Sequence, residues 1–249
     1  MSTKLDVLAI GAHPDDLELG CGGTLALLAR QGRRVGVLHL TGGERGTRGT
    51  PEERRAEAEE AARALGAAEL AFLDCGDGAF RYGEAEEDAL IDVLRGWRPD
   101  LVLGPTPHDR HPDHARAHHL VEAACFYSGL ANRCPGKEPY RPAAVFSYMQ
   151  HDPFDPSFIV DVSSVWEAKM ESLRAYRSQL FQGEHEKKED EKGGEPPMTK
   201  VASREFRLAV EGRARHFGLL IGAEFGEPFW SRLPLAVRDP LAVLPGGVR

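Results

Sequence analysis

The chain has 249 residues, of which 41% are hydrophobic and 28% charged, a balance typical of a globular α/β domain that folds without disulfides. Its formal net charge of −8 argues against a nucleic-acid partner, because most of the surface would repel a polyanion. No Cys-x-x-Cys pair, apolar leader or stretch of membrane-spanning length occurs, so we expect a reduced, cytoplasmic protein with no membrane contact.

The first half of the chain alternates between strand and helix patterns. Four short apolar runs have the composition of buried parallel strands: residues 5–11, 34–40, 70–74 and 101–104. Helical patterns follow each of them, at 22–31, 51–65, 84–97 and 113–127. Because strands separated regularly by helices form doubly wound sheets, we predict an α/β fold with a mostly parallel sheet flanked by helices.

The second half of the chain is less regular. Strand and then helix patterns continue at 145–148, 158–162, 164–176 and 201–221. Residues 182–197 are charged, contain Gly and Pro and have almost nothing to bury, which predicts a surface loop. Residues 233–249 predict either a packed tail or an interface arm. We assign residues 1–249 to a single domain, with its core at 5–180 and a C-terminal helix and tail at 200–249.

Two tetrapeptides gather imidazole and carboxylate groups around a proline. Residues 13–16 read His-Pro-Asp-Asp after the first predicted strand, and residues 111–114 read His-Pro-Asp-His after the fourth. One such turn is usually only a turn or a helix cap. Ligands of open α/β sheets bind beyond the carboxyl ends of the strands, and ionisable groups are costly to bury unpaired. Two such turns in these positions therefore favour a functional site.

Three of these side chains have the donor atoms of an open catalytic zinc site. His13, Asp16 and His114 would give two nitrogens and one oxygen, and would leave one position for a water molecule. The pKa of a zinc-bound water falls to about 7, which favours a metal-dependent hydrolase. The donor set does not fix the metal, because Fe(II) and Mn(II) accept the same ligands.

The remaining ionisable groups of the tetrapeptides suit proton transfer. Asp15 adjoins the proposed ligand Asp16, and neighbours on a turn can point in different directions, so Asp15 can act as the general base. His111 lies about one helical turn before His114 and can serve as the acid or the oxyanion partner. Asp113 is the nearby carboxylate that could orient His111 and raise its pKa.

At these residues the chain resembles the LmbE-like (PIG-L) family of zinc-dependent N-acetylglucosamine deacetylases. The family signature is an HPDD turn near the N-terminus and a later HPDH, and the similarity spans at least residues 5–180. Further matching segments lie at 18–24, 41–44, Arg54 and 178–179. The resemblance implies a Rossmann-like fold and these roles: zinc on His13, Asp16 and His114, Asp15 as base, and His111 at the oxyanion with Asp113 behind it.

Within the family, residues 42–50 and 118–130 look most like the bacillithiol-pathway branch, which deacetylates N-acetylglucosaminyl-malate. Malate would add two carboxylates, which forked guanidinium groups bind well. We expect an amino-sugar substrate held by four residues: Arg54, Glu44, Arg110 and Gln150.

Other interpretations stay open at this point. A deacetylase of another N-acetylated sugar, such as diacetylchitobiose, would need no clamp for malate. A non-catalytic sugar-binding module would have a disrupted ligand set, which this sequence does not show. A nucleotide enzyme is disfavoured because the glycine fingerprint is missing. Family members are often hexamers, so the resemblance also implies a homo-oligomer.

Overall fold

The central sheet contains seven strands. The computed structural model describes residues 4–180 and 199–240. In these residues the strands are β1 Val7–Gly11, β2 Val35–His39, β3 Glu69–Phe72, β4 Leu101–Gly104, β5 Ala144–Tyr148, β6 Phe158–Asp161 and β7 Gly226–Trp230. Their order across the sheet is β3-β2-β1-β4-β5-β7-β6. The first five strands are parallel, and β7 pairs antiparallel with both β5 and β6.

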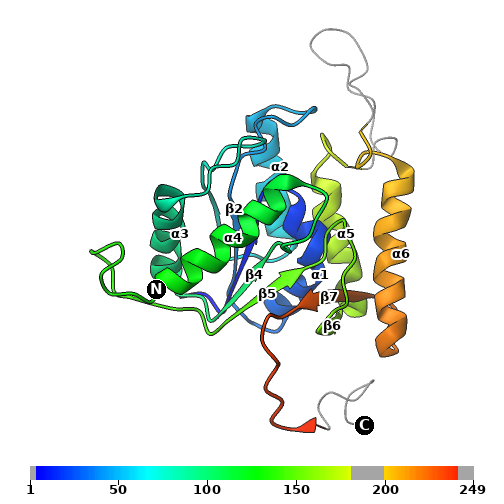
Figure 1. Ribbon diagram of the computed structural model, residues 1–249. Coiled ribbons are helices and arrows are strands. Elements are labelled where there is room, and N and C mark those ends of the chain that lie inside the picture. The colour runs from blue at the N-terminus through cyan, green and yellow to red at the C-terminus, as the bar shows by residue number, and fades with distance from the viewer. Residues whose placement is uncertain (1–3, 181–198, 241–249) are drawn as a thin grey trace.

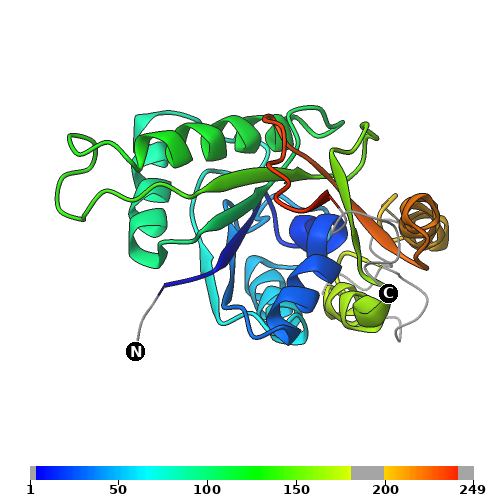
Figure 2. The same ribbon diagram turned by 90° about the horizontal axis from the view of Figure 1, so that it is seen from below.

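Helices cover both faces of this sheet (Figure 1 and Figure 2). They are α1 Asp16–Arg30, α2 Pro51–Ala64, α3 Glu84–Trp97, α4 Pro112–Tyr127, α5 Trp166–Ala175 and α6 Arg204–Ile221, with a short 3₁₀ turn at Ser163–Val165. Figure 2 shows α3 and α4 on one face and α1, α2 and α5 on the other. Each face has its own apolar core. The sequence prediction of an α/β, mostly parallel, helix-flanked sheet is therefore confirmed.

The position of β1 between β2 and β4 fixes where the two tetrapeptides lie. All five residues of β1 are buried, as expected for an apolar strand covered by helices on both faces. The strand pairs in parallel with β2 on one side and β4 on the other, with Val7 opposite Val35 and Leu101. The carboxyl ends of β1 and β4 are therefore neighbours, and residues 13–16 and 111–114 leave the sheet side by side.

Two elements differ from the sequence prediction. The first helix begins at Asp16 rather than at residue 22, and Cys21 interrupts it with non-helical dihedral angles (φ −141°, ψ 16°). Glycines at positions 20, 22 and 23 weaken the helical pattern there, which explains the late predicted start. Strand β7 was not predicted. It is short, contains Pro228 and has no alternating pattern, because it is buried between two other strands.

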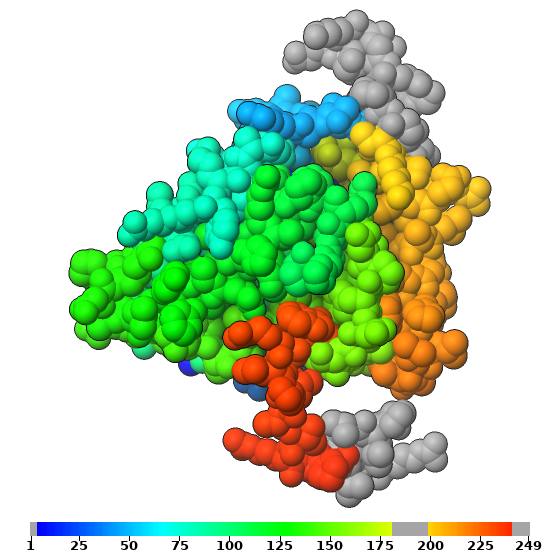
Figure 3. Space-filling view, in the orientation of Figure 1, coloured from blue at the N-terminus to red at the C-terminus, as the bar shows by residue number. Residues whose placement is uncertain are grey.

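The C-terminal part of the chain has less regular structure. The predicted surface loop at 182–197 lies outside the described residues, as does the end of the predicted tail. Residues 231–239 form neither helix nor strand, are mostly exposed and leave the body of the protein after β7 (Figure 3). Among the helices of the described residues, none combines the length and apolar character needed to cross a membrane. The division into core and C-terminal part stays a prediction.

Gly20 offers a test of packing at the start of α1. A Cβ atom there would clash with Cδ2 of Tyr148, whose ring is fully buried and whose hydroxyl donates to the Ile10 carbonyl. We predict that Gly20→Ala lowers the free energy of unfolding by about 1–3 kcal/mol, because the ring must shift in a close-packed core. Urea unfolding measures this.

Gly212 in α6 provides the matched control, because a Cβ atom there meets nothing within 4 Å. Gly212→Ala should stabilise the protein by about 0.5–1 kcal/mol through helix propensity alone. Equal effects of the two substitutions would contradict the proposed contact with Tyr148.

Candidate metal centre and active site

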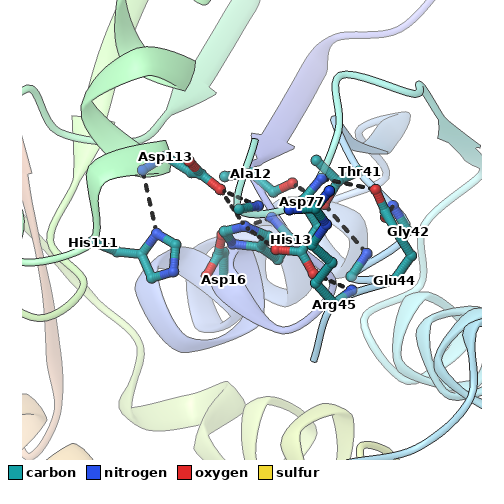
Figure 4. A network of polar contacts seen from close by, with 12 residues as sticks. Ala12, His13, Asp16, Thr41, Gly42, Glu44, Arg45, Asp77, His111 and Asp113 are labelled. Carbon is teal, nitrogen blue, oxygen red and sulfur yellow. Dashed lines mark hydrogen bonds and ion pairs between the residues drawn. The ribbon is translucent and has the colours of Figure 1, made fainter. Parts of the chain in front are cut away.

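The two tetrapeptides meet at the carboxyl ends of β1 and β4. Residues 13–16 form the turn from β1 into α1, and residues 111–114 form the start of α4. The ring centroid of His13 lies 4.8 Å from that of His111 and 5.7 Å from that of His114. Figure 4 shows Asp16, Asp77 and Asp113 gathered around His13. The predicted convergence of these two distant segments is therefore present.

The turn after β1 has an unusual backbone. Asp15 precedes the first helical residue with φ 98° and ψ −22°, a left-handed conformation that is rare and costly outside glycine. The surroundings hold the turn in place: the His13 amide donates to Oδ2 of Asp16 over 2.8 Å, and the Thr41 hydroxyl donates to the Ala12 carbonyl over 2.9 Å. In this turn Asp15 and Asp16, although adjacent in the chain, contact different partners.

The Asp16 carboxylate lies between two imidazoles. Its Oδ2 is 3.3 Å from Nδ1 of His13, and its Oδ1 is 3.3 Å from Nε2 of His114. All three residues are buried. Burial raises the pKa of Asp16, but the charge and hydrogen bonds of the two histidines outweigh burial and hold the pKa well below its ordinary value. Two nitrogens and one carboxylate thus face one another in a buried position.

The outward nitrogens of these histidines contact carboxylates. Nε2 of His13 lies 3.3 Å from Oδ1 of Asp77 and 3.3 Å from Oδ2 of Asp113. Nδ1 of His114 lies 3.0 Å from Oδ1 of Asp109. Histidines that bind metals usually donate their second N–H to such a carboxylate, which fixes the ring and its tautomer. The donor set and its surroundings therefore fit a metal ion held by the inward nitrogens and Asp16.

Within residues 4–180 and 199–240, three groups of His and Asp have ligand atoms within 4.8 Å of one another. They are His13, His111 and His114; Asp109, His114 and His151; and His13, Asp77 and Asp113. Asp16 joins the first group through its contacts with His13 and His114. The three groups overlap, so they describe one metal-binding region rather than separate sites.

Asp15 lies beside this cluster. Burial raises the pKa of Asp15 to about 7, against the opposing charge of Arg54, and the neighbouring Asp16 carboxylate raises it further. Oδ2 of Asp15 is 4.0 Å from Nη2 of Arg54. A carboxyl group with a pKa near neutrality can accept a proton and release it again.

Arg54 supports the first tetrapeptide from α2. Its helix begins with a capping box between Thr50 and Glu53, which fixes the first turn and with it the position of Arg54. The buried guanidinium donates to the Gly43 carbonyl over 2.7 Å and to the Pro14 carbonyl over 2.9 Å. Its Nε is buried without a hydrogen-bond partner among the described residues. Its predicted role as a clamp for a substrate carboxylate stays a prediction.

His111 caps α4 and faces the cluster. Its Nδ1 accepts a hydrogen bond from the Asp113 amide over 3.3 Å, and its ring stacks on His114 with centroids 4.9 Å apart. Burial lowers the pKa of His111, and the charges of His13 and His114 lower it further. The Asp113 carboxylate, expected behind His111, instead contacts His13, the Gly78 amide and Arg116.

The other predicted substrate-binding residues lie at different depths. Gln150 is buried, and its side-chain amide donates to Oδ1 of Asp16. Glu44 is exposed and accepts from the amides of Gly42 and Asp77. Arg110 is exposed immediately before the second tetrapeptide. Gln150 therefore touches a proposed metal ligand, whereas Glu44 and Arg110 lie near the surface.

Asp77, Asp109 and His151 were not among the site residues predicted from the sequence. Asp109 precedes the second tetrapeptide by two residues, and Asp77 follows β3 between two glycines, so both occupy loops at the carboxyl ends of strands. His151 follows β5, and its ring lies parallel to that of His114 with centroids 5.7 Å apart. Position after a strand end was the available signal, and applying it to every strand would have found all three.

The chain is similar to several known proteins. The family model described as GlcNAc-PI de-N-acetylase (PIG-L) matches residues 8–125. Diacetylchitobiose deacetylase of Thermococcus kodakarensis is 36% identical over 191 residues, which cover 70% of each protein. 4-Oxalmesaconate hydratase of Pseudomonas putida is 30% identical over 189 residues, covering 69% of this chain and 73% of the relative. The crystal structure of a conserved protein of Thermus thermophilus has a TM-score of 0.83 and 37% identity, covering 95% of this chain and 98% of that one.

Asp109 allows a test of the outer carboxylates. We predict that Asp109→Asn weakens zinc binding by about 10- to 100-fold, because the neutral amide no longer holds the outward nitrogen of His114 as a carboxylate does. Titration of metal-free protein with zinc, against a competing chelator, measures the dissociation constant. Asp92→Asn is the matched control, since Asp92 pairs with Lys137 on the surface. An unchanged zinc affinity in Asp109→Asn would contradict a role of the Asp109 carboxylate in holding His114 for the metal.

Proposed function

The chain belongs to the PIG-L family, and from this premise we propose that it is a metal-dependent hydrolase that removes the N-acetyl group from an N-acetylglucosamine conjugate. The observation that carries the proposal is the convergence of His13, Asp16 and His114, with Asp15 beside them and carboxylates behind both histidines. The relative from T. kodakarensis, a diacetylchitobiose deacetylase, supports the same reaction class.

The metal in this proposal is Zn²⁺, with Fe²⁺ as the alternative. Nδ1 of His13, the Asp16 carboxylate and Nε2 of His114 would hold it, and their donor types suit both ions. When bound, such an ion supplies polarisation of the acetamide carbonyl and a lowered pKa of a water molecule.

The residues of the chain then divide the proton transfers. Asp15 takes a proton from the attacking water and returns it to the sugar nitrogen as the C–N bond breaks, so that acetate and a free amine leave. Its pKa near 7 suits both steps. His111 uses Nδ1 to accept the Asp113 amide, so its Nε2 carries the proton in the neutral ring and can donate to the tetrahedral oxyanion.

For the substrate, we propose N-acetylglucosaminyl-malate of bacillithiol biosynthesis. Residues 42–50 and 118–130, which resemble that branch, support this choice, and the exposed Arg110 supplies a guanidinium for a malate carboxylate near the second tetrapeptide. The alternative is diacetylchitobiose, which the T. kodakarensis relative favours.

The proposal also includes a homo-oligomer in the cytoplasm. Self-association is supported by Leu219 and Leu220, two adjacent leucines that are both exposed near the C-terminal end of α6.

A second candidate reaction is the hydration of an unsaturated carboxylic acid. The relative from P. putida, a 4-oxalmesaconate hydratase, favours it, and a metal with a carboxylate base could also serve that chemistry. The two reactions differ in product, because only deacetylation releases acetate.

A screen for acetate release tests the function. Metal-free protein is loaded with Zn²⁺, Fe²⁺ or no metal and offered N-acetylglucosamine, its malate conjugate and diacetylchitobiose, and in a separate hydration assay 4-oxalmesaconate. We expect release with metal only, and fastest from the malate conjugate. Fastest release from diacetylchitobiose would overturn the malate assignment. Hydration of 4-oxalmesaconate without any acetate release would overturn the deacetylase proposal.

Asp15 gives the mechanistic test. We predict that Asp15→Asn lowers kcat by about 100-fold or more while zinc still binds, because the amide cannot accept the water proton and Asp15 is not among the ligands. His114→Ala should lose both zinc and turnover. Metal analysis beside initial rates separates these outcomes, and full activity in Asp15→Asn would exclude Asp15 as the base.

A further inference from the structure

Helix α1 is interrupted beside a carboxylate from the far end of the chain. Just after the break at Cys21, the Gly23 and Thr24 amides donate to the two oxygens of Glu227 on β7, over 2.8 and 2.7 Å. The Thr24 hydroxyl adds a third hydrogen bond of 2.7 Å to the same carboxylate. A side-chain oxygen that accepts from the first amides of a helical segment acts as an N-cap. Glu227 therefore caps the second half of α1 from within the protein.

The break also leaves a helix carbonyl for other partners. In an uninterrupted helix the Leu19 carbonyl would accept from the Gly23 amide. Here it accepts from Nζ of Lys169 and from Nη2 of Arg213, each over 3.0 Å. Nζ of Lys169 is also 2.5 Å from Oε1 of Glu227, and both of these side chains are at most 3% exposed. The charged side chains of this network thus bond to the Gly23 and Thr24 amides and to the Leu19 carbonyl, which the break in α1 leaves without their helical partners.

The same network reaches the proposed metal site by a second route. Arg213 donates through Nη1 to the backbone carbonyl of Gln150, while its Nη2 holds the Leu19 carbonyl. Gln150 in turn donates from its side-chain amide to Oδ1 of Asp16. Asp16 is the first residue of the half of α1 that ends at the break. The network therefore reaches Asp16 in two ways, through the Leu19 carbonyl of the same helix segment and through Gln150.

Stability alone gives a poor account of this network. Removing two charges from water is costly, and well-packed apolar residues often replace a buried ion pair without loss of stability. The residues come from α5, α6 and β7, and all of them contact α1 within its first nine residues, beginning at Asp16. A geometric role accounts for this convergence.

We propose that Glu227, Lys169 and Arg213 are positioning residues that fix the direction of the first turns of α1, and so the placement of Asp16 between His13 and His114. This inference rests on the proposed metal site. The network sets how tightly the metal is bound, without touching the metal or the substrate.

Arg213 gives the cleanest test, because it is only partly buried and its forked guanidinium joins two carbonyls. We expect Arg213→Met to weaken zinc binding by about 10- to 100-fold, as for other outer partners of metal ligands. The zinc affinity of Arg213→Lys should lie between those of wild type and Arg213→Met, since one ammonium group cannot donate to both carbonyls as the forked guanidinium does. Zinc dissociation constants are measured on metal-free protein that circular dichroism shows to be folded.

Arg215 supplies the control on the same helix. It is exposed and pairs with Glu211 and Glu224, so Arg215→Met should leave zinc affinity unchanged. A merely structural network predicts a different pattern, in which Arg213→Met lowers the unfolding midpoint but leaves the dissociation constant of the folded protein at the wild-type value. That pattern would overturn the inference.

Lys169→Met provides a second test of the positioning role, which does not depend on Arg213. This substitution leaves in place the three donors of Gly23 and Thr24 that bond to Glu227, and the measurement is again made on protein that circular dichroism shows to be folded. Weaker zinc binding is expected again. Asp16→Asn separates the proposed metal site from the proposed positioning role: if this variant binds zinc like wild type, the proposed metal site fails. If Asp16→Asn loses zinc while both the Arg213 and Lys169 variants keep it, only the positioning role fails.

Discussion

The parallel pairing of β1 with β4 is the constraint on which the site depends. It makes neighbours of two strand ends that are about ninety residues apart in the chain, and each strand end leads into a His-Pro-Asp turn. Buried apolar strands are stabilised by the cores on both faces, so this proximity is fixed by the whole sheet and not by the polar residues themselves. Imidazoles and carboxylates can then be held together at a depth where burial would otherwise disfavour charged groups.

A charged side chain around the site also supports the backbone of the loops that carry the site residues. The Arg54 guanidinium spans the carbonyls of Gly43 and Pro14 and lies beside Asp15, while its predicted contact with a substrate carboxylate stays a prediction. A buried guanidinium must satisfy its donors, and backbone carbonyls of nearby loops are suitable acceptors. Here the hydrogen bond from Arg54 to the Pro14 carbonyl holds the peptide just before Asp15. Arg54 therefore helps to stabilise the left-handed conformation of Asp15.

Local pattern predicted the parallel half of the fold and the convergence of the tetrapeptides, because strand ends and His-Pro-Asp turns are readable within a few residues. It did not predict β7, whose short Pro-containing segment becomes a strand only by pairing with β5 and β6. Nor could it pair Asp109 with His114 or Asp113 with His13, since those choices depend on side-chain directions at the meeting of separate loops. The break in α1 is similar: glycines indicate weakness, but the carboxylate that caps the second half comes from residue 227.

The position of Glu227 and Arg213 late in the chain has a consequence for biosynthesis. Both tetrapeptides have been translated once residue 114 leaves the ribosome, whereas the groups that hold α1 in its bent form arrive only about a hundred residues later. A nascent chain therefore carries every proposed ligand well before it can order them. Docking of α6 and β7, which supply Arg213 and Glu227, is therefore the last step that the proposed positioning of Asp16 requires.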